Sequence, residues 1–264
     1  MSGIIDDRKI VGKCGPGLIL KNHKFLSRGI IIFFHLIDHL IGVDGGNDFI
    51  GAFVAGGDNG HTQFQRVKET DTWPLLVIND LLRTIGQLPF YLQLMKHLAA
   101  QGIKVPMPQA NAQGDILFTV CDKPAAVVQR LRGESELQPS ANHCQAVGDM
   151  LARMHLAGSD FARQQPNLRG LPWWNDTVPV VLPFLNDTQT ALIQTELAYQ
   201  NHISTSGAYA ALPRGPVHAD LFRDNVMFDG TGDALELTGF FDFYFAGVDT
   251  WLFDVAVCLN DWCK

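Results

Sequence analysis

The chain has 264 residues, of which 47% are hydrophobic, and its formal net charge at pH 7 is -7. This length suits one large domain or two small lobes with a real core, and the acidic balance argues against nucleic acid as the main partner, because phosphate backbones attract basic patches. The five cysteines are scattered and form no CxxC pair, which is typical of buried thiols in a reducing compartment and indicates no zinc site.

Residues 1–85 show no persistent pattern of helix or strand. Their most apolar run, GIIIFFHLIDHLIGV at residues 29–43, is too short to span a membrane, contains Asp38 and lies too far from Met1 for a signal peptide. We therefore expect a cytoplasmic protein with no membrane contact. The glycine-rich residues 43–60 lack the GxxxxGK[ST] pattern of a phosphate-binding loop, so irregular chain is expected there.

The pattern becomes regular after residue 86. GQLPFYLQLMKHLAAQG predicts an amphipathic helix over residues 87–101, with Leu88, Tyr91, Leu92, Met95 and Leu98 on one face and Gly102 as its C-terminal cap. DILFTV and AAVVQRL, separated by CDKP, predict a β-hairpin.

The later part of the chain predicts mostly helices. A helix is expected at residues 140–158, with Ser140 as N-cap and Val147, Leu151 and Met154 on its apolar face. NDTQTALIQTELAYQNHI predicts a third helix, and WLFDVAVCLNDW a fourth near the C-terminus. Between them, NVMF and LELTGFF form a predicted hairpin around the turn DGTGD.

The most informative stretch is GPVHADLFRDNVMFDG, where His218, Asp220 and Asn225 stand in the pattern H-x-D-x-x-x-x-N, and Asp242 follows the next hairpin. Phosphoryl transfer from a nucleotide needs one carboxylate to accept a hydroxyl proton, and an amide and a second carboxylate to hold Mg²⁺. We assign the first role to Asp220 and the metal to Asn225 and Asp242. Ordinary turn formation by these residues is the alternative.

Two neighbouring residues have weaker assignments. His218 is more simply explained as a structural residue that hydrogen-bonds within the loop than as a catalytic group. Asp254, in WLFDVA, is a candidate to brace the same loop, and the alternative is an ordinary acid in the first turn of a helix.

These stretches resemble homoserine kinase of the aminoglycoside-phosphotransferase-like, protein-kinase-like family. HADLFRDNVMFDG and GFFDFYFAGVDTWLFDVAVCLNDWC carry the resemblance, and QLPFYLQLMKHLAAQGIKVPMP, HCQAVGDMLARMHLAG and QPNLRGLPWW support it. The likeness covers about residues 87–263. The loop pattern alone occurs in many small-molecule kinases, whereas LFRDN and DFYFA together indicate homoserine.

The resemblance implies an α+β, protein-kinase-like two-lobed fold with an incomplete N-terminal β-lobe and a mostly helical C-terminal lobe. Residues 1–85 would be an unmatched segment, residues 86–132 a remnant of the N-terminal lobe with the hinge, and residues 133–264 a catalytic lobe that stops short. It also implies ATP and Mg²⁺ as cofactors, homoserine as the small-molecule substrate, and a step of threonine biosynthesis. The adenine-binding hinge would fall at Gln129, Arg130 and Leu131.

Several points stay open at this stage. Lys68 is the only basic residue at a plausible distance to pair with the phosphates, and the helix at residues 87–101 has no glutamate to pair with it.

A free amino acid needs a cation for its carboxylate, which Arg223 or Arg169 could supply, although both could equally be solvated surface residues. The alternative functions are a kinase for another small alcohol, such as choline or an aminoglycoside, and a non-catalytic fragment of such a kinase.

Overall fold

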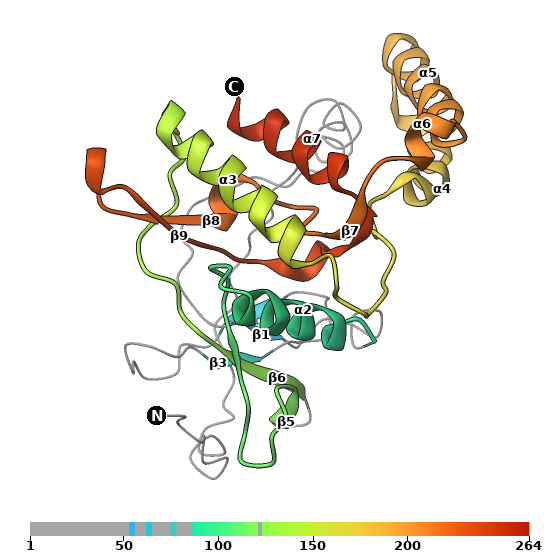
Figure 1. The fold of residues 1–264 in the computed structure, drawn as a ribbon. Coiled ribbons are helices and arrows are strands. Elements are labelled where there is room, and N and C mark those ends of the chain that lie inside the picture. Colours follow the sequence, from blue (N-terminus) through green and yellow to red (C-terminus); the bar gives the residue numbers. More distant parts are fainter. Residues whose placement is uncertain (1–52, 56–61, 65–74, 78–85, 121–122, 264) are drawn as a thin grey trace. The chain divides into compact units, whose positions relative to one another are not determined.

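The computed structural model describes residues 53–55, 62–64, 75–77, 86–120 and 123–263 (Figure 1). These residues divide into two compact units with the boundary between Arg132 and Gly133. The first unit holds strands β1 to β6 and helix α2, and the second holds helices α3 to α7 and strands β7 to β10.

The first unit is built on antiparallel strands around β6 (Lys123–Val128). One edge of β6 pairs with β3 (Leu75–Val77), and its other partners are β4 (Pro108–Gln109) and β5 (Phe118–Val120). A separate antiparallel pair joins β1 (Phe53–Ala55) and β2 (Thr62–Phe64). The predicted hairpin is confirmed in its pairing of β5 with β6, although both strands begin and end at other residues than the sequence predicts.

The strands β1, β2 and β3 correct the expectation of irregular chain in residues 1–85. Each has only three residues, which is too short to produce an alternating hydrophobic pattern, and the glycines around β1 are typical of loops. Lys68 and the apolar run at residues 29–43 lie outside the described residues.

Helix α2 (Leu88–Ala100) confirms the predicted helix of this unit. All five residues of the predicted apolar face are buried, and so are Phe90 and Leu94, so α2 is buried on more than one side. Gly102 adopts a positive φ of 79°, its N–H donates to the carbonyl of Ala99, and that of Ile103 donates to Leu98. This is a Schellman cap, which favours glycine at the left-handed position.

The second unit contains the other predicted helices. They are α3 (Ala141–Ala157), α5 (Asp187–Ser204) and α7 (Trp251–Trp262). Ser140 is the N-cap of α3, as predicted. Val147, Leu151 and Met154, the predicted apolar face of this helix, are buried. The short helix α6 (Gly207–Ala210) follows α5. No helix among the described residues has the length and apolar character needed to cross a membrane.

Helix α4 (Leu171–Val181) was not predicted, because Pro179 inside it opposes a helix, although Pro172 is compatible with the first turn. Packing overrides this propensity. Trp174 of α4 belongs to a buried cluster shared with α5, whose buried members are Trp174, Val178, Val181 and Ile193. In Figure 1, α4, α5 and α6 gather at one corner of the second unit.

Two antiparallel strand pairs carry the functional residues of the second unit. Strand β7 (Arg214–Val217) pairs with β10 (Gly247–Thr250), and β8 (Val226–Asp229) pairs with β9 (Glu236–Phe240). The β8–β9 pair confirms the second predicted hairpin. Strands β7 and β10 were not predicted, since Gly215, Pro216 and Gly247 interrupt them.

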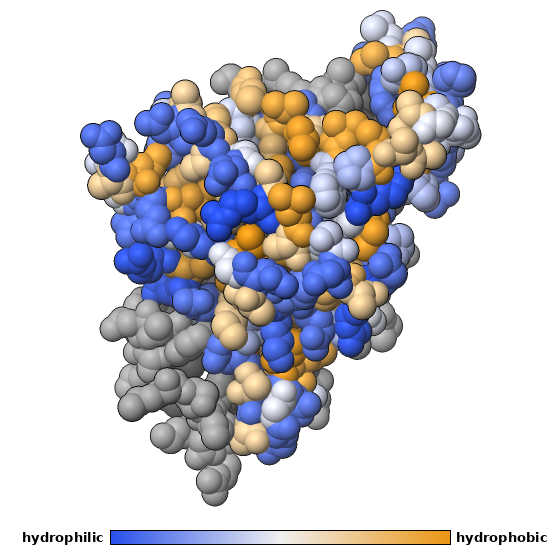
Figure 2. Space-filling view, viewed as in Figure 1, coloured by the Kyte–Doolittle hydropathy of each residue, from blue (hydrophilic) through white to orange (hydrophobic). Residues whose placement is uncertain are grey.

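Helix α7 has a buried and an exposed face. The buried face carries Asp254, Val257, Cys258, Asp261 and Trp262. On the other face the side chains of Leu252 and Leu259 are 53% and 58% exposed. Figure 2 shows apolar side chains gathered over the part of the surface where α7 lies.

Candidate functional site

The loop between β7 and β8 holds the predicted catalytic residues, and it is held by helix α7. The backbone N–H groups of His218 and Ala219 donate to the two carboxylate oxygens of Asp254, at 2.8 and 2.7 Å. Ala219 adopts a left-handed conformation with φ of 65°, which turns the chain so that both N–H groups face the same carboxylate. Asp254 is fully buried, and these two donors together with His155 compensate its charge.

The side chain of His218 connects the loop to the end of β9. Its Nδ1 accepts from the N–H of Asp220 at 3.2 Å, and its Nε2 donates to the carbonyl of Phe241 at 2.8 Å. Burial lowers the pKa of His218, although the nearby Asp254 raises it in part. A neutral imidazole fits both hydrogen bonds, and this arrangement supports the structural role for His218.

Asn225 lies against Asp220 at the other end of the loop. Its Nδ2 donates to the backbone carbonyl of Asp220 at 2.7 Å and to the carboxylate Oδ2 at 3.1 Å. Because the amide group is planar, these bonds direct its Oδ1 away from Asp220. The amide oxygen is the atom that a hard cation would take.

The β8–β9 hairpin brings Asp242 to the same place. Val226 pairs with Phe240, and the N–H of Phe241 donates to the carbonyl of Asn225 at 3.0 Å, so the residue after Phe241 lies beside the start of β8. Asp242 adopts a left-handed conformation with φ of 64°. The structure thus places Asp220, Asn225 and Asp242 together, as the spacing predicts.

The carboxylates of this cluster are crowded and poorly solvated. Burial raises the pKa of Asp220 well above its usual range, and the charges of Asp242 and Asp224 raise it further. The hydrogen bond from Asn225 and the charge of Arg169 oppose this rise. Burial likewise raises the pKa of Asp242 to about 6, with a further contribution from Asp224. The cluster therefore favours a bound cation.

The donor set fits magnesium. Asn225 and Asp242 offer hard oxygen ligands, which Mg²⁺ prefers. Burial raises the pKa of Asp242 although the backbone of Tyr244 donates a hydrogen bond to it, so a cation would stabilise its charge. Within the described part of the chain, no three His, Cys, Asp or Glu side chains converge on one metal position. Such an ion would therefore complete its coordination with water and phosphate oxygens, which is the usual mode for Mg²⁺.

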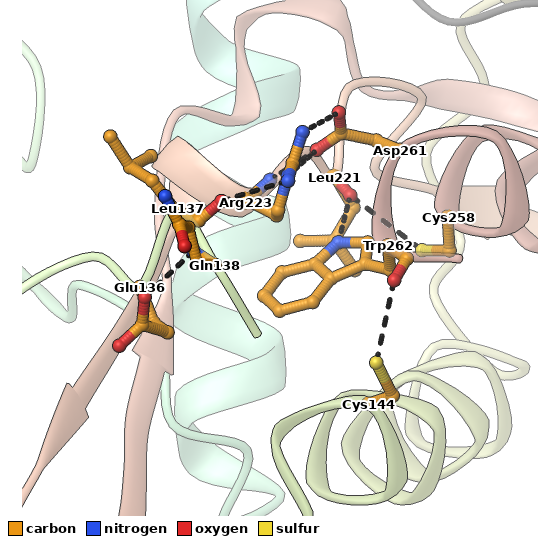
Figure 3. A network of polar contacts seen from close by, with 9 residues as sticks. All are labelled: Glu136, Leu137, Gln138, Cys144, Leu221, Arg223, Cys258, Asp261 and Trp262. Atoms are coloured by element: carbon orange, nitrogen blue, oxygen red, sulfur yellow. Dashed lines mark hydrogen bonds and ion pairs between the residues drawn. The ribbon is translucent and has the colours of Figure 1, made fainter. Parts of the chain in front are cut away.

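Arg223 forms an ion pair with Asp261, a second acid of α7 (Figure 3). Its backbone N–H and its Nε donate to Oδ2 of Asp261 at 2.9 and 3.1 Å, and its Nη2 donates to Oδ1 at 3.1 Å. Its Nη1 donates to the carbonyl of Leu137 at 2.8 Å. All three guanidinium nitrogens of Arg223 donate hydrogen bonds that hold the loop in place, so the geometry supports a structural role for this residue.

Asp261 and Trp262 also hold the loop between β7 and β8, and the sequence did not predict this role. The indole N–H of Trp262 donates to the carbonyl of Leu221 at 3.0 Å, so α7 contacts the middle of the loop as well as both ends (Figure 3). Asp254 and Asp261 are seven residues apart, two helical turns, and this spacing on one helical face could have indicated that both acids point inward.

His155 of α3 was also missed. Its Nε2 lies 2.9 Å from Oδ2 of Asp254, and its ring stacks on Trp251 with centroids 5.4 Å apart. His155 therefore links α3 to the carboxylate that holds the loop. No signal in the sequence pairs these residues, which lie 99 positions apart.

Arg169 and the predicted hinge occupy different units. Arg169, in the second unit, lies over the rings of Trp173 and Phe245, with its guanidinium carbon 4.9 Å from each centroid. Gln129, Arg130 and Leu131 follow β6 in the first unit, where the N–H of Gln129 donates to the carbonyl of Met107 at 3.0 Å. Their adenine-binding role stays a prediction.

The fold is that of kinase-like phosphotransferases. A solved structure of aminoglycoside phosphotransferase APH(3'')-Id from Streptomyces rimosus, in complex with ADP and streptomycin, aligns with a TM-score of 0.51. The alignment covers 70% of each chain at 18% sequence identity, which establishes similarity of fold. The predicted protein-kinase-like fold is confirmed.

The chain belongs to the phosphotransferase enzyme family (APH), whose sequence profile matches residues 54–264. It is 66% identical over 180 residues to a protein named homoserine kinase from Polaromonas naphthalenivorans, covering 68% of this chain and 56% of that protein. A homoserine kinase from Burkholderia vietnamiensis is 58% identical over 184 residues, covering 68% and 55%. The chain thus spans about half the length of these curated relatives.

Proposed function

We propose that this protein catalyses ATP-dependent phosphorylation of the hydroxyl of L-homoserine, giving ADP and O-phospho-L-homoserine, a step of threonine biosynthesis. The observation that carries the proposal is the convergence of Asp220, Asn225 and Asp242 at the end of the β8–β9 hairpin. The substrate is assigned from the relatives named homoserine kinase, the first of them 66% identical over the matched residues.

Each residue of the cluster has a separate task. Asp220 orients the acceptor hydroxyl and accepts its proton, and its raised pKa suits a base that must hold a proton during the reaction. Asn225 and Asp242 would hold Mg²⁺, which neutralises charge on the phosphates when bound. Gln129, Arg130 and Leu131 would contact the adenine of ATP. Asp254 and His218 keep the loop in the conformation that these roles require.

The test is a coupled ADP-release assay on the whole chain with Mg²⁺ and ATP, comparing L-homoserine, choline and kanamycin as acceptors. We expect ADP release that depends on homoserine and is absent without Mg²⁺. Asp233→Asn, an exposed acid in the turn before β9, is the matched control and should keep full activity. A higher kcat/KM for choline or kanamycin would overturn the substrate assignment.

A non-catalytic nucleotide-binding protein is the second outcome that the assay must separate. Titration of ATP with and without Mg²⁺, followed by calorimetry, distinguishes the two. Binding that strengthens with Mg²⁺ but gives no ADP with any of the three acceptors would contradict the kinase function while leaving the metal assignment in place.

A further inference from the structure

The segment at residues 165–170 is fixed to the stretch of chain that follows Asp242. The N–H of Val248 donates to the carbonyl of Gln165 at 2.7 Å, and Nε2 of Gln165 donates to the carbonyl of Ala246 at 2.9 Å. The side chain of Gln165 is 8% exposed, so both hydrogen bonds are shielded from water. An amide buried in this way stabilises a defined loop conformation, since leaving it unpaired would be unfavourable.

Asn167 adds a second anchor. Its Nδ2 donates to Oδ2 of Asp249 at 2.8 Å, and its Oδ1 accepts from the backbone N–H of Arg169 at 2.9 Å. The backbones approach so closely here that a Cβ on Gly247 would lie 2.8 Å from the Cα of Asn167, which only glycine avoids. The backbone of Arg169 is therefore positioned through Asn167, which contacts strand β10.

The side chain of Arg169 is fixed as well. Its guanidinium lies over Trp173, from α4, and over Phe245, three residues after Asp242, with 4.9 Å to each ring centroid. Its positive charge acts on Asp220, whose pKa it lowers in part. Arg169 thus acts electrostatically on the proposed base, and aromatic rings from two elements that are distant in sequence hold its guanidinium.

Aromatic rings contact the face of a guanidinium, whereas a carboxylate is recognised through the N–H groups along its edge. We propose that Arg169 binds the carboxylate of the acceptor, and so selects alcohols that carry a carboxylate. This inference rests on the proposed function and names the group that its site recognises. The other arginine that the sequence offers, Arg223, donates instead to Asp261 and Leu137.

The charge of Arg169 also predicts which acceptors are rejected. A polycationic acceptor would bring like charge next to the guanidinium, which is unfavourable in a partly desolvated site. An uncharged alcohol would gain nothing from the arginine. The site therefore favours an amino acid alcohol over choline or an aminoglycoside.

The experiment compares two acceptors that differ only in the carboxylate, L-homoserine and 3-amino-1-propanol. Arg169→Gln should reduce kcat/KM for L-homoserine about 10- to 100-fold, mostly through KM, because a hydrogen-bonded ion pair is lost. Its kcat/KM for 3-amino-1-propanol should fall much less, because this acceptor loses only the effect of the Arg169 charge on Asp220. Arg163→Gln, an exposed arginine near the same segment, is the matched control and should leave both acceptors unaffected.

An equal loss with both acceptors, or no loss with L-homoserine, would overturn the inference. Arg169→Lys keeps the charge without the planar edge and should be intermediate, and thermal melting of each variant checks that it folds. If the parent protein phosphorylates neither acceptor, the proposed function fails. Calorimetry of L-homoserine in the presence of Mg²⁺ and ADP then decides about Arg169, since binding to the parent that Arg169→Gln abolishes supports the inference and any other result refutes it.

Discussion

The acids of helix α7 and those at the end of the β8–β9 hairpin are surrounded very differently. Asp254 accepts two backbone N–H groups and a bond from His155, and Asp261 pairs with the guanidinium and backbone of Arg223. By contrast, burial raises the pKa of both Asp220 and Asp242, and the charge of Asp224 raises both further.

This difference separates stabilising acids from functional ones. A buried carboxylate with its full set of donors holds the backbone in place, whereas crowded carboxylates destabilise the protein until a cation or a proton joins them. Substitutions at the two groups should therefore have opposite effects on folding. Functional sites commonly keep such unfavourable groups because their chemistry requires them.

The largest effect is expected from Asp220→Asn. The amide cannot accept the hydroxyl proton, so the rate of ADP release with L-homoserine should fall about 10²- to 10⁴-fold. Nucleotide binding should persist, because we assign the metal to Asn225 and Asp242. An unchanged rate in the Asp220→Asn protein would show that this carboxylate is not the base, and Asp233→Asn serves as the control for a change of net charge.

On the stabilising side, Asp254→Ala should lower the free energy of unfolding by about 3–5 kcal/mol. The substitution leaves the N–H groups of His218 and Ala219 and the Nε2 of His155 without their acceptor inside the protein. Urea unfolding followed by circular dichroism measures the change. A loss no greater than that of Asp233→Ala would mean that the loop does not depend on this carboxylate.

A smaller loss of stability is expected from substitutions in the ion pair between Arg223 and Asp261. The side chains of this pair are 25% and 12% exposed, so water partly replaces the lost interaction. Arg223→Gln and Asp261→Asn should each destabilise the protein by about 1–3 kcal/mol, with a coupling energy of about 1 kcal/mol in the double mutant. Because the pair positions the loop, kcat should fall while KM for ATP stays the same. Strictly additive effects would indicate that the two side chains act independently.

An effect on folding of opposite sign is expected from Asp242→Asn in the absence of Mg²⁺. A pKa raised to about 6 means that the ionised carboxylate disfavours the folded state above that pH, and that this penalty disappears as pH falls toward the ordinary value of 3.8. The variant should thus be more stable than the parent by about 3 kcal/mol at about pH 8, with little difference at about pH 4. It should also lose Mg²⁺-dependent nucleotide binding.

Urea unfolding at the two pH values checks the Asp242→Asn prediction, and calorimetry of Mg²⁺ with ATP checks the binding. A gain in stability that is the same at both pH values would rule out titration of Asp242 as its cause. Asp233→Asn is again the control, since an exposed acid should show no such dependence on pH.

Regular hydrophobic patterns predicted four of the helices and both hairpins, whereas the fold class followed from the family resemblance. Helix α2 has five apolar residues at helical spacing and a glycine cap, so its position follows from local signals. Helix α4 could not be predicted in the same way, because Pro179 opposes a helix that the buried cluster with α5 imposes. The strands β1 to β3 are too short to leave a pattern, and only pairing across the chain defines them.

The site was predictable where its residues lie close together in the chain. Asp220, Asn225 and Asp242 follow from loop spacing and a hairpin with a clear turn. The partners that hold them, His155 and Asp261, depend on how helices pack, and periodicity does not encode which helix faces which loop. The pairing of Arg223 with Asp261 likewise depends on helix packing that the sequence does not reveal.

The bonds to Asp254 also have a consequence for the order of folding. Its bonds to the loop join residues 35 and 36 positions apart, whereas its bond to His155 closes a segment of 99 positions. Loop closure becomes entropically less favourable with length, by about 1 kcal/mol over this difference. We therefore expect the chain from β7 to α7 to assemble first as a local nucleus, with α3 docking afterwards. The loop between β7 and β8 would then reach its folded conformation before His155 of α3 packs against Asp254.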